Sequence, residues 1–372
     1  MADSIQTPTQ PTAAALDHAH LWHPFTPMRQ WRETDPLVID RADGFYLIDD
    51  QGNRYLDGVS SLWCNVHGHR VPAIDQAIRD QLDKVAHSTM LGLTHEPAAQ
   101  FAHQLVERIN RHVPDTIDGQ DKLNKVFYTD AGATAVEVAF KMAVGYWFHQ
   151  GKPEKNKFIG LQGAYHGDTA GTMSVGYSDL FHKPFLSMVF DVKSFPSPDV
   201  LRPTHYKGFP PCSNPGRGSG ICKTCGTSDS QCDKTWLSEC EMFGNNLGYD
   251  CIMHLDKLLK EQAHQTAAIC IEPIMQGAAG MVCQPPGFVA AVARLAKQYD
   301  VLLILDEVAT GFGRTGEMFA FESEVKLSQN QPNEDIDFRF TGPDILCLAK
   351  GITGGYLPLA ATVTTDKIEA AF

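Results

Sequence analysis

The residues best suited to chemistry lie in two stretches that each follow a short apolar run. Asp306 and Glu307 follow residues 301–305, and Lys350 follows residues 345–349. Such a run before a polar break is typical of a strand buried on both faces, and a charge at its end costs free energy unless something there uses it. A lysine in this position is a candidate Schiff-base amine, because desolvation lowers its pKa and frees its lone pair.

An aspartate and a lysine at the ends of two strands match what pyridoxal 5'-phosphate requires of a protein. Lys350 would form the imine, and Asp306 would keep the pyridine nitrogen protonated so that the ring withdraws electrons. Each residue alone has a plainer interpretation, because strand-end acids are common and a lysine after a strand usually points into water. The glycines that follow both residues, in 311–316 and 351–355, favour the pyridoxal interpretation.

Two loops could contact the same cofactor. Residues 130–134, Asp-Ala-Gly-Ala-Thr, precede a long apolar stretch that predicts a core helix. Their small side chains would let N–H groups at the helix start bind a phosphate. Tyr165, in Tyr-His-Gly at 165–167, could stack on the cofactor ring, or it could simply cover the edge of the sheet.

The elements that position these residues alternate between strands and helices, which predicts an α/β fold with a largely parallel sheet. The predicted strands are 126–129, 158–162, 188–192, 267–271, 301–305 and 345–348, and the predicted helices are 133–149, 251–264 and 288–299. Nearer the N-terminus, residues 37–57 predict a hairpin. Pro72 and Pro97 each stand at a favoured first-turn position and predict two further helices.

Composition limits the class of protein. The 372 residues are 43% hydrophobic and 20% charged, as expected of a globular protein with one large domain or two ordinary ones. The net charge of −13, without a Lys/Arg block, argues against nucleic acid and anionic membranes as partners. Residues 1–20 are expected to be a disordered lead-in and not a signal peptide. The ten cysteines are not spaced like a secreted framework, which favours a reducing cytoplasm.

Residues 203–250 are rich in Pro, Gly, Ser and Cys, and we interpret them as an insertion. Cys222 and Cys225 form a Cys-x-x-Cys pair that could bind a structural zinc together with Cys232 and Cys240. The spacing between Cys232 and Cys240 is not that of a zinc ribbon. We therefore favour a surface insertion with free thiols and expect no metal.

Taken in order, these motifs resemble the class III pyridoxal-phosphate-dependent aminotransferases of fold type I. The resemblance extends from about residue 20 to the last residue, and it depends on five motifs: Asp-Ala-Gly-Ala-Thr, Tyr-His-Gly, Glu272-Pro273, Asp-Glu-Val-x-Thr-Gly-Phe-Gly-Arg-Thr-Gly and Ala-Lys-Gly-x-x-Gly-Gly. It implies a homodimer whose large domain, here 72–372, has a mostly parallel seven-stranded sheet with helices on both faces. Residues 21–71 would belong to a smaller domain.

The resemblance also implies a role for each matching residue. Lys350 would be the catalytic lysine, which holds the cofactor and moves the proton. Asp306 would face the pyridine nitrogen, and Gly132 and Ala133 would bind the phosphate. Tyr165 would line the ring and the substrate.

Within this family, the chain most resembles the members that transaminate 8-amino-7-oxononanoate in biotin synthesis, and three features carry this closer resemblance. They are the stretches 23–26 and 60–68 and the residue Ala309. Members that act on ornithine or GABA usually have Gln at the position of Ala309, and that type of ω-aminotransferase is the alternative.

By the same resemblance, Phe25, Leu62 and Trp63 would contact the substrates. Many biotin-pathway members have Tyr at the position of Phe25 and two consecutive Trp at the position of Leu62 and Trp63. The usual amino donor is S-adenosylmethionine, but some members with the Phe and a single Trp use lysine. The sequence leaves both donors open.

The chain ends at Phe372, shortly after Lys350. Members of the family continue through a second phosphate-binding loop and a C-terminal small domain. We therefore expect a partial chain without the C-terminal small domain, and an inactive truncated chain is a further alternative.

Overall fold

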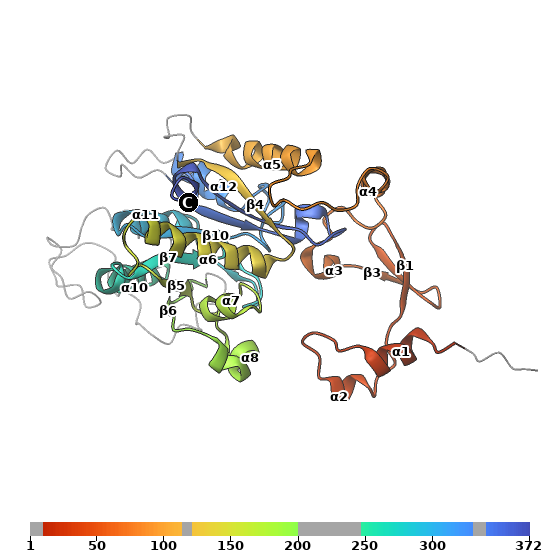
Figure 1. The fold of residues 1–372 in the computed structure, drawn as a ribbon. Helices are drawn as coiled ribbons and strands as arrows, with labels where there is room; N and C mark the ends of the chain where they lie inside the picture. The colour runs from red at the N-terminus through yellow and green to blue at the C-terminus, as the bar shows by residue number, and fades with distance from the viewer. Residues whose placement is uncertain (1–9, 114–120, 200–246, 330–339) are drawn as a thin grey trace, which may run out of the picture. The chain divides into compact units, whose positions relative to one another are not determined.

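The computed structural model describes residues 10–113, 121–199, 247–329 and 340–372 (Figure 1). The chain divides into two units, Met1–His87 and Ser88–Phe372. The sequence placed the start of the large domain at residue 72, but helix α4 (Pro72–Leu82) belongs to the first unit.

The N-terminal unit contains a small antiparallel sheet of β1 (Ile39–Asp43), β2 (Tyr46–Asp49) and β3 (Arg54–Leu56), which confirms the predicted hairpin. Asp49 closes the turn between β2 and β3, because its carboxylate accepts hydrogen bonds from the backbone and the side chain of Asn53 at 2.7 and 2.9 Å. These bonds hold the pKa of Asp49 below its ordinary value, the side-chain bond most of all.

A helix forms in the stretch that the sequence analysis expected to be a disordered lead-in. The side chain of Thr12 caps α1 (Ala13–His20) by accepting a hydrogen bond from the Ala15 N–H. Asp17 in α1 accepts hydrogen bonds from Trp31 Nε1 and His23 Nε2, both at 2.7 Å. Long-range contacts with these aromatic residues therefore order α1. The unit also contains α2 (Met28–Trp31) and α3 (Ser60–Trp63).

The second unit is built on a seven-stranded sheet in the order β4, β12, β11, β10, β7, β5, β6. The strands are β4 (Leu123–Thr129), β5 (Lys157–Leu161), β6 (Lys193–Phe195), β7 (Thr266–Ile271), β10 (Leu302–Asp306), β11 (Ile345–Leu348) and β12 (Ala360–Thr365). Only β12 runs antiparallel to its neighbours, so the prediction of a mostly parallel sheet is confirmed. A separate small ribbon is formed by β8 (Met275–Gln276) and β9 (Val282–Cys283).

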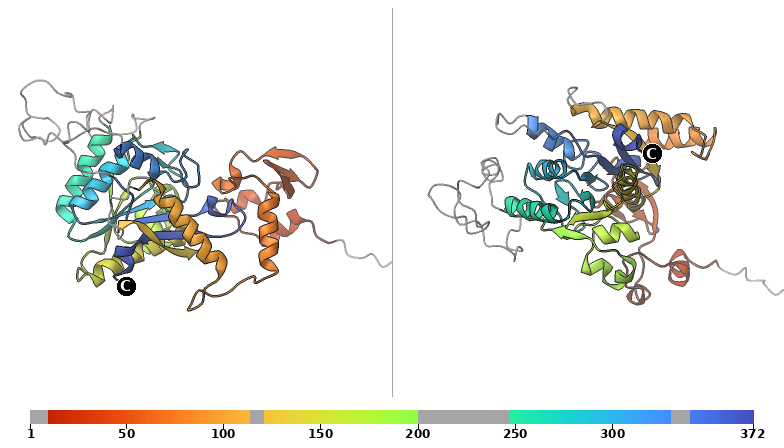
Figure 2. Two further views of the ribbon diagram at one scale, coloured as in Figure 1. Left: turned by 90° about the horizontal axis from the view of Figure 1, so that it is seen from above. Right: turned by 60° about the vertical axis from the view of Figure 1, so that its left-hand side comes forward.

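Helices cover both faces of this sheet (Figures 1 and 2). One face packs against α6 (Gly132–His149), α7 (Ala170–Val175) and α13 (Asp366–Glu369). The other packs against α5 (Glu96–Ile109), α10 (Leu247–Gln262), α11 (Phe288–Gln298) and α12 (Phe321–Gln329). Successive residues of a strand alternate between the two cores: Ile304 faces α6, while Leu303 and Leu305 face α11. The short elements are α8 (Asp179–His182), η1 (Asn110–His112), η3 (Lys183–Met188) and η5 (Lys350–Thr353).

Two elements differ from the sequence prediction. The edge strand predicted at 188–192 is wrong, because β6 lies at Lys193–Phe195 and η3, which contains Pro184 in its first turn, occupies Lys183–Met188. The sequence analysis missed β12, whose run of Ala, Thr and Val is not strongly apolar. It is nevertheless fully buried, because Ala361 and Val363 pack into one core and Ala360 into the other. On the α6 side the Thr362 hydroxyl donates a 2.7 Å hydrogen bond to Ala135 O.

The predicted helices at 133–149, 251–264 and 288–299 correspond to α6, α10 and α11. The four candidate zinc ligands Cys222, Cys225, Cys232 and Cys240 lie outside the described residues. Among the helices that the structure describes, none is both long and apolar enough to cross a membrane.

Candidate active site

Asp306, the last residue of β10, forms a buried charge pair with a histidine. Its Oδ2 lies 2.7 Å from His166 Nδ1, and the two side chains are 4% and 0% exposed. Because a carboxylate can only accept, Nδ1 donates this bond. Burial alone would lower the pKa of His166, but Cys270 and Asp306 beside it outweigh that effect and raise it well above its ordinary value. The pair therefore places a carboxylate at the end of β10 with its charge compensated.

Glu307 has a different role from its neighbour. It lies on the other side of the sheet end, where its carboxylate accepts hydrogen bonds from Ala320 N at 2.7 Å and Phe321 N at 2.8 Å. It thereby caps the start of α12. Burial raises its pKa to about 8. Of the two strand-end acids, only Asp306 is available to a site on the α6 side.

The start of α6 lies between the loops that follow β10 and β11. A Cβ added at Gly132 would lie 2.7 Å from Val308 Cγ1 and 3.5 Å from Ala349 Cβ. A Cβ added at Gly167 would lie only 2.4 Å from Ala133 Cβ. The predicted phosphate-binding residues are thus packed against residues one or two positions away from Asp306, Lys350 and His166. N–H groups of a first helical turn have no partner within the helix and favour an anion.

Lys350 occupies a backbone conformation that is rare for a residue with a side chain. Its φ is +48°, and it opens η5, one residue after the end of β11. The following turn packs closely on the glycine-rich loop after β10, since a Cβ added at Gly351 would lie 3.0 Å from Phe312 Cβ. Such backbone strain persists only where the surroundings impose it, and it is concentrated at functional sites.

Tyr165 lies on the loop that carries His166. Its hydroxyl donates a 2.7 Å hydrogen bond to Asp168 Oδ2, and its ring stacks on that of His182, with centroids 6.2 Å apart. Burial, the bond to Asp168 and the nearby charge of Asp306 all raise the pKa of Tyr165, so the phenol stays neutral. The residue is half-buried beside the Asp306 pair.

Glu272, in the Glu-Pro motif, joins two loops of the site. Its carboxylate accepts hydrogen bonds from Tyr165 N at 3.1 Å and from Gly277 N at 3.0 Å. Burial raises its pKa to about 7. It therefore fixes the Tyr165 loop against the segment that precedes β9.

The second unit thus places the predicted residues Gly132, Ala133, Tyr165, Asp306 and Lys350 on segments that contact one another: the start of α6 meets Val308, Ala349 and Gly167, and His166 pairs with Asp306. A helix N-terminus, a buried carboxylate and a lysine amine together suit a phosphorylated aromatic carbonyl compound.

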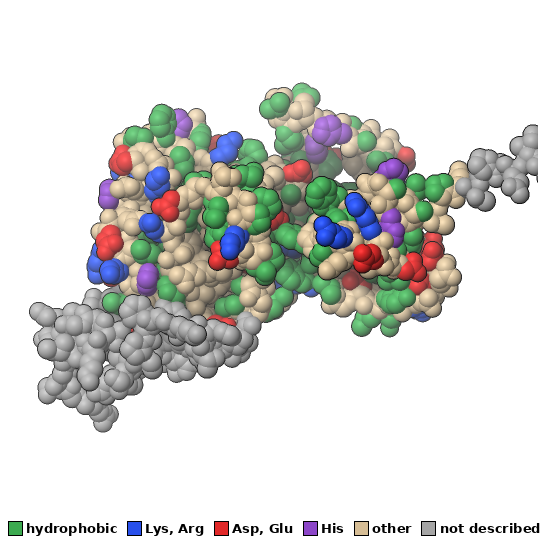
Figure 3. Space-filling model, turned by 90° about the horizontal axis from the view of Figure 1, so that it is seen from below, with side chains coloured by type: hydrophobic (Ala, Val, Ile, Leu, Met, Phe, Trp, Pro, Cys, Tyr) green, Lys and Arg blue, Asp and Glu red, His purple; other side chains and the backbone are tan. Residues whose placement is uncertain are grey.

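The predicted substrate residues Phe25, Leu62 and Trp63 lie in the N-terminal unit. All three have positive φ values, of +50°, +69° and +66°. Phe25 and Leu62 expose 70% and 65% of their surface, and exposed apolar side chains are visible on this unit in Figure 3. Their contact with substrates stays a prediction.

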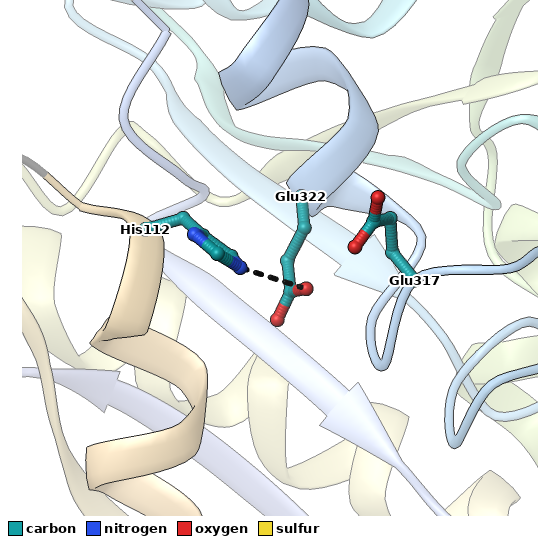
Figure 4. Close-up of side chains that lie close together, drawn as sticks. All are labelled: His112, Glu317 and Glu322. Atoms are coloured by element: carbon teal, nitrogen blue, oxygen red, sulfur yellow. Dashed lines mark ion pairs between the residues drawn. The ribbon is translucent and has the colours of Figure 1, made fainter.

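A cluster of His112, Glu317 and Glu322 in the second unit has the composition of a metal site (Figure 4). However, its carboxylates already have cationic partners. Arg108 donates to both oxygens of Glu322, at 2.8 and 3.3 Å, and Lys326 lies 2.7 Å from Glu317. We interpret the cluster as an ion-pair network that ties α5 and η1 to α12.

Sequence reasoning missed His166 and Cys270 as members of the site. His166 stands in the Tyr-His-Gly motif that drew attention to Tyr165, so its position was visible although its partner was not. Cys270 lies inside the predicted strand 267–271, and its Sγ lies 3.7 Å from His166 Nε2 and 4.0 Å from Nδ1.

The comparisons with known proteins agree with this geometry. The family model for class-III aminotransferases matches residues 28–208 and 236–372. A curated relative from Geobacter sulfurreducens, named adenosylmethionine-8-amino-7-oxononanoate aminotransferase, is 40% identical over 96% of this chain and 66% of its own length. A relative of the same name from Nitratidesulfovibrio vulgaris is 42% identical over 96% of this chain and 55% of its own length.

The chain thus spans less than two thirds of the length of both curated relatives. A crystal structure of the aminotransferase of that name from Methanocaldococcus jannaschii superposes with a TM-score of 0.74 at 38% identity, over 96% of this chain and 66% of that one. The fold predicted from the motifs is confirmed, and the chain belongs to the class-III aminotransferase family.

Proposed function

We propose that this chain is the cofactor-binding part of a pyridoxal-phosphate-dependent aminotransferase that converts 8-amino-7-oxononanoate to 7,8-diaminononanoate in biotin biosynthesis. The observation that carries the proposal is the packing of Gly132, at the start of α6, against the neighbours of Asp306 and Lys350. The relatives of that printed name, at 40% and 42% identity, support the choice of substrate.

In this proposal each residue has a defined role. The N–H groups of Gly132 and Ala133 bind the phosphate at the positive end of α6. Asp306 holds a proton on the ring nitrogen, and the His166 imidazole 2.7 Å away offsets its charge. Pyridoxal phosphate supplies an electron-withdrawing ring that accepts the electrons of the bond broken at the amino carbon. Lys350 holds the cofactor through its amine and then carries the proton between carbon atoms.

The proposal is tested by replacing Lys350 with Ala in this protein. Covalent pyridoxal phosphate, trapped by borohydride reduction and measured by mass spectrometry, should be lost. Amination of 8-amino-7-oxononanoate should fall by roughly a thousandfold or more, because the same amine does both tasks. The control is Lys193→Ala, a half-exposed lysine on β6 that pairs with Asp191. Retained labelling in Lys350→Ala without added amine would refute the assignment.

We propose further that Phe25, Leu62 and Trp63 provide apolar surface for the substrates, and that lysine is a better donor than S-adenosylmethionine. Phe25 lacks the hydroxyl of a tyrosine, and Leu62 offers less flat surface for an adenine ring than a tryptophan. Together these differences would weaken S-adenosylmethionine binding by roughly tenfold.

This donor preference predicts that Phe25→Tyr combined with Leu62→Trp favours S-adenosylmethionine. The measurement is release of each donor's keto product in a single turnover at equal concentrations. Phe45→Tyr is the control, because Phe45 is an exposed aromatic of the same unit outside the predicted substrate residues. Faster turnover of the unaltered protein with S-adenosylmethionine would contradict the proposal.

We also propose that the protein is a cytoplasmic homodimer. Free thiols at Cys64 and Cys283, both partly exposed, are compatible with a reducing compartment. Leu91 and Leu93 expose 90% and 60% of their surface, which favours cover by another subunit. Sedimentation equilibrium of the protein tests the dimer, and a concentration-independent monomer mass would rule it out.

A further inference from the structure

The short helix α3 of the N-terminal unit, Ser60–Trp63, is a left-handed turn. Its four residues have φ values of +53°, +47°, +69° and +66°. Hydrogen bonds from Trp63 N to Val59 O at 2.8 Å and from Cys64 N to Ser60 O at 3.1 Å have the spacing of an α-helix, so only the hand is reversed. Among the described residues, the other non-glycine residues with positive φ are isolated from one another.

A left-handed turn made of residues with side chains must be held by its surroundings. In this conformation Cβ lies close to the following carbonyl oxygen, so each such residue costs free energy that a glycine would not. The strain persists only where surrounding contacts impose it, and it is concentrated at functional sites. Because the proposed substrate residues Leu62 and Trp63 end the turn, its hand sets the directions of both side chains.

Asp57 supplies side-chain contacts that hold this turn. Its carboxylate is nearly buried, with 8% of the side chain exposed. Oδ1 accepts a hydrogen bond from Ser61 N at 2.9 Å, and Oδ2 accepts one from Ser61 Oγ at 2.8 Å. Both donors belong to a residue whose φ is +47°, so the carboxylate stabilises Ser61 directly in the left-handed conformation.

The carboxylate is itself fixed to the small antiparallel sheet. Asp57 directly follows β3, and its N–H donates to Phe45 O at 2.8 Å. His69 Nε2 lies 3.0 Å from Asp57 Oδ2 and donates this bond, because a carboxylate can only accept. His69 N in turn donates to Gly44 O at 2.6 Å. Acid and imidazole are therefore both attached to the connection between β1 and β2.

We infer that Asp57 is a positioning residue of the proposed active site, whose carboxylate holds the left-handed turn Ser60–Trp63 and thereby sets the directions of Leu62 and Trp63 for substrate binding. This inference rests on the proposed function, in which these two side chains provide apolar surface for the substrates. Asp57 acts through the backbone of the turn, so its role requires no contact with substrate or cofactor.

The plainer interpretation is that Asp57 only ends β3, and glycine substitutions separate the two interpretations. Glycine adopts a positive φ readily, so Ser60→Gly should replace part of what Asp57 contributes if Asp57 holds the turn. Val59→Gly is the matched control, because Val59 adjoins Ser60 but has a φ of −93°. If Asp57 only ends β3, neither glycine compensates for its loss.

The first measurement is hydrogen exchange of residues 60–65 in the cofactor-free protein, followed by mass spectrometry. Asp57→Ala should raise the exchange rate of this segment by roughly tenfold or more, as expected when a hydrogen bond to a charged group is lost. Adding Ser60→Gly should recover most of the protection, and adding Val59→Gly should recover none. Asp40→Ala removes an exposed acid of the same unit and should leave the exchange unchanged.

The second measurement is the amination of 8-amino-7-oxononanoate by the same variants. In Asp57→Ala the KM for this keto acid should rise by roughly tenfold while kcat changes little, because an apolar surface binds the ground state and the transition state alike. Adding Ser60→Gly should lower the KM again.

Unchanged exchange of residues 60–65 in Asp57→Ala would overturn the inference, as would recovery by both glycines or by neither. A constant KM despite faster exchange would also overturn it. If Asp57→Ala does not fold, Ser61→Ala serves in its place, because it removes only the hydroxyl that Asp57 Oδ2 accepts. Absence of amination in the unaltered protein would refute the proposed function instead, and the exchange measurement does not depend on it, so the two failures are distinguishable.

Discussion

At the scale of single residues, Asp306 is the side chain whose charge matters most to the proposed site. Asn in its place is nearly isosteric but neutral, so it cannot hold a proton on a ring nitrogen as a carboxylate does. It also deprives His166 of its anionic partner at 2.7 Å. We predict that Asp306→Asn keeps the cofactor but loses roughly 10²–10³-fold in turnover, the usual cost of one preorganised electrostatic contact.

The measurement for Asp306→Asn is kcat at saturating substrate, with cofactor occupancy determined in parallel by mass spectrometry. The two readouts separate a loss of binding from a loss of chemistry. A variant that is fully loaded and turns over normally would show that some other group faces the ring.

The sequence was informative about the residues that end strands and begin helices. Lys350, Asp306 and Gly132 stand at breaks between apolar runs and small residues, and such breaks are local patterns. The partners of these residues were not predictable, because they depend on which loops meet. Glu307 illustrates this limit: it adjoins Asp306, yet strand alternation turns it to the other face, where it caps α12.

At the scale of elements, the close approach of the Tyr165 loop to α6 depends on Gly167. Its φ is +126°, and a Cβ there would meet Ala133 Cβ at 2.4 Å. We predict that Gly167→Ala lowers the free energy of unfolding by about 2–4 kcal/mol, through the positive φ and the overlap together. The matched control is Gly151→Ala. Gly151 has a φ of +75°, but no atom lies within 4 Å of the added Cβ, so this variant measures the cost of the positive φ without any overlap.

Both glycine variants are compared by denaturant unfolding at equal temperature. The Gly167→Ala variant should unfold at a clearly lower denaturant concentration than Gly151→Ala. Equal midpoints would mean that the loop and the start of α6 separate at little cost. The close packing between the Tyr165 loop and the start of α6 would then contribute little to stability.

The ion-pair network between α5 and α12 is the basis of a second prediction about elements. Glu322 is fully buried, and Arg108 contacts both of its carboxylate oxygens. Because Arg108→Ala leaves that carboxylate without its main partner, we expect a loss of about 3–5 kcal/mol in the free energy of unfolding. Lys326→Ala breaks the more exposed pair with Glu317 and should cost about 1 kcal/mol or less.

The same denaturant assay measures this contrast between Arg108→Ala and Lys326→Ala. A small effect of Arg108→Ala would mean that His112, whose Nε2 lies 3.8 Å from Glu322, replaces the guanidinium. Adding a divalent cation should not restore Arg108→Ala, because the cluster is interpreted as an ion-pair network and not as a metal site.

Elements with strong periodicity were predictable, and elements defined by their neighbours were not. The long apolar helix α6 and the apolar run of β10 were found at nearly their observed positions. The edge strand β6 was misplaced because only three residues pair there. Strand β12 was missed because it is buried by β4 and β11 beside it and by the cores on both faces of the sheet. A local pattern of Ala, Thr and Val does not reveal such burial.

At the scale of the whole molecule, the second unit buries several carboxyl groups. Burial raises the pKa of Asp344 to about 6, of Glu272 to about 7 and of Glu307 to about 8. Each of these carboxyls is held by backbone N–H groups, so each is specified by the fold. All three therefore change the free energy of unfolding in the same direction as the pH changes.

The direction of this pH dependence follows from the number of protons that the folded and unfolded states bind. Between about pH 4, where these carboxyls titrate in an unfolded chain, and their raised folded values, the folded state binds more protons than the unfolded state. The stability that they contribute is therefore full below about pH 4 and is lost as the pH rises through their folded pKa values. His166, whose pKa is also raised, acts in the same direction. The lowered pKa values of Asp17, Asp49 and Asp57 act only below this window.

We therefore predict that the midpoint of thermal unfolding of the cofactor-free protein falls as the pH rises from about 5.5 to 8.5. Each group contributes at most about 1.4 kcal/mol per pH unit. Glu307→Gln should flatten the slope, because an amide does not titrate, although it lowers stability at every pH by sacrificing one of the two bonds at the start of α12. Glu317→Gln is the control, since Glu317 has a lowered pKa and should leave the slope unchanged. A midpoint that rises over this range would show that groups outside these buried carboxyls dominate the pH dependence.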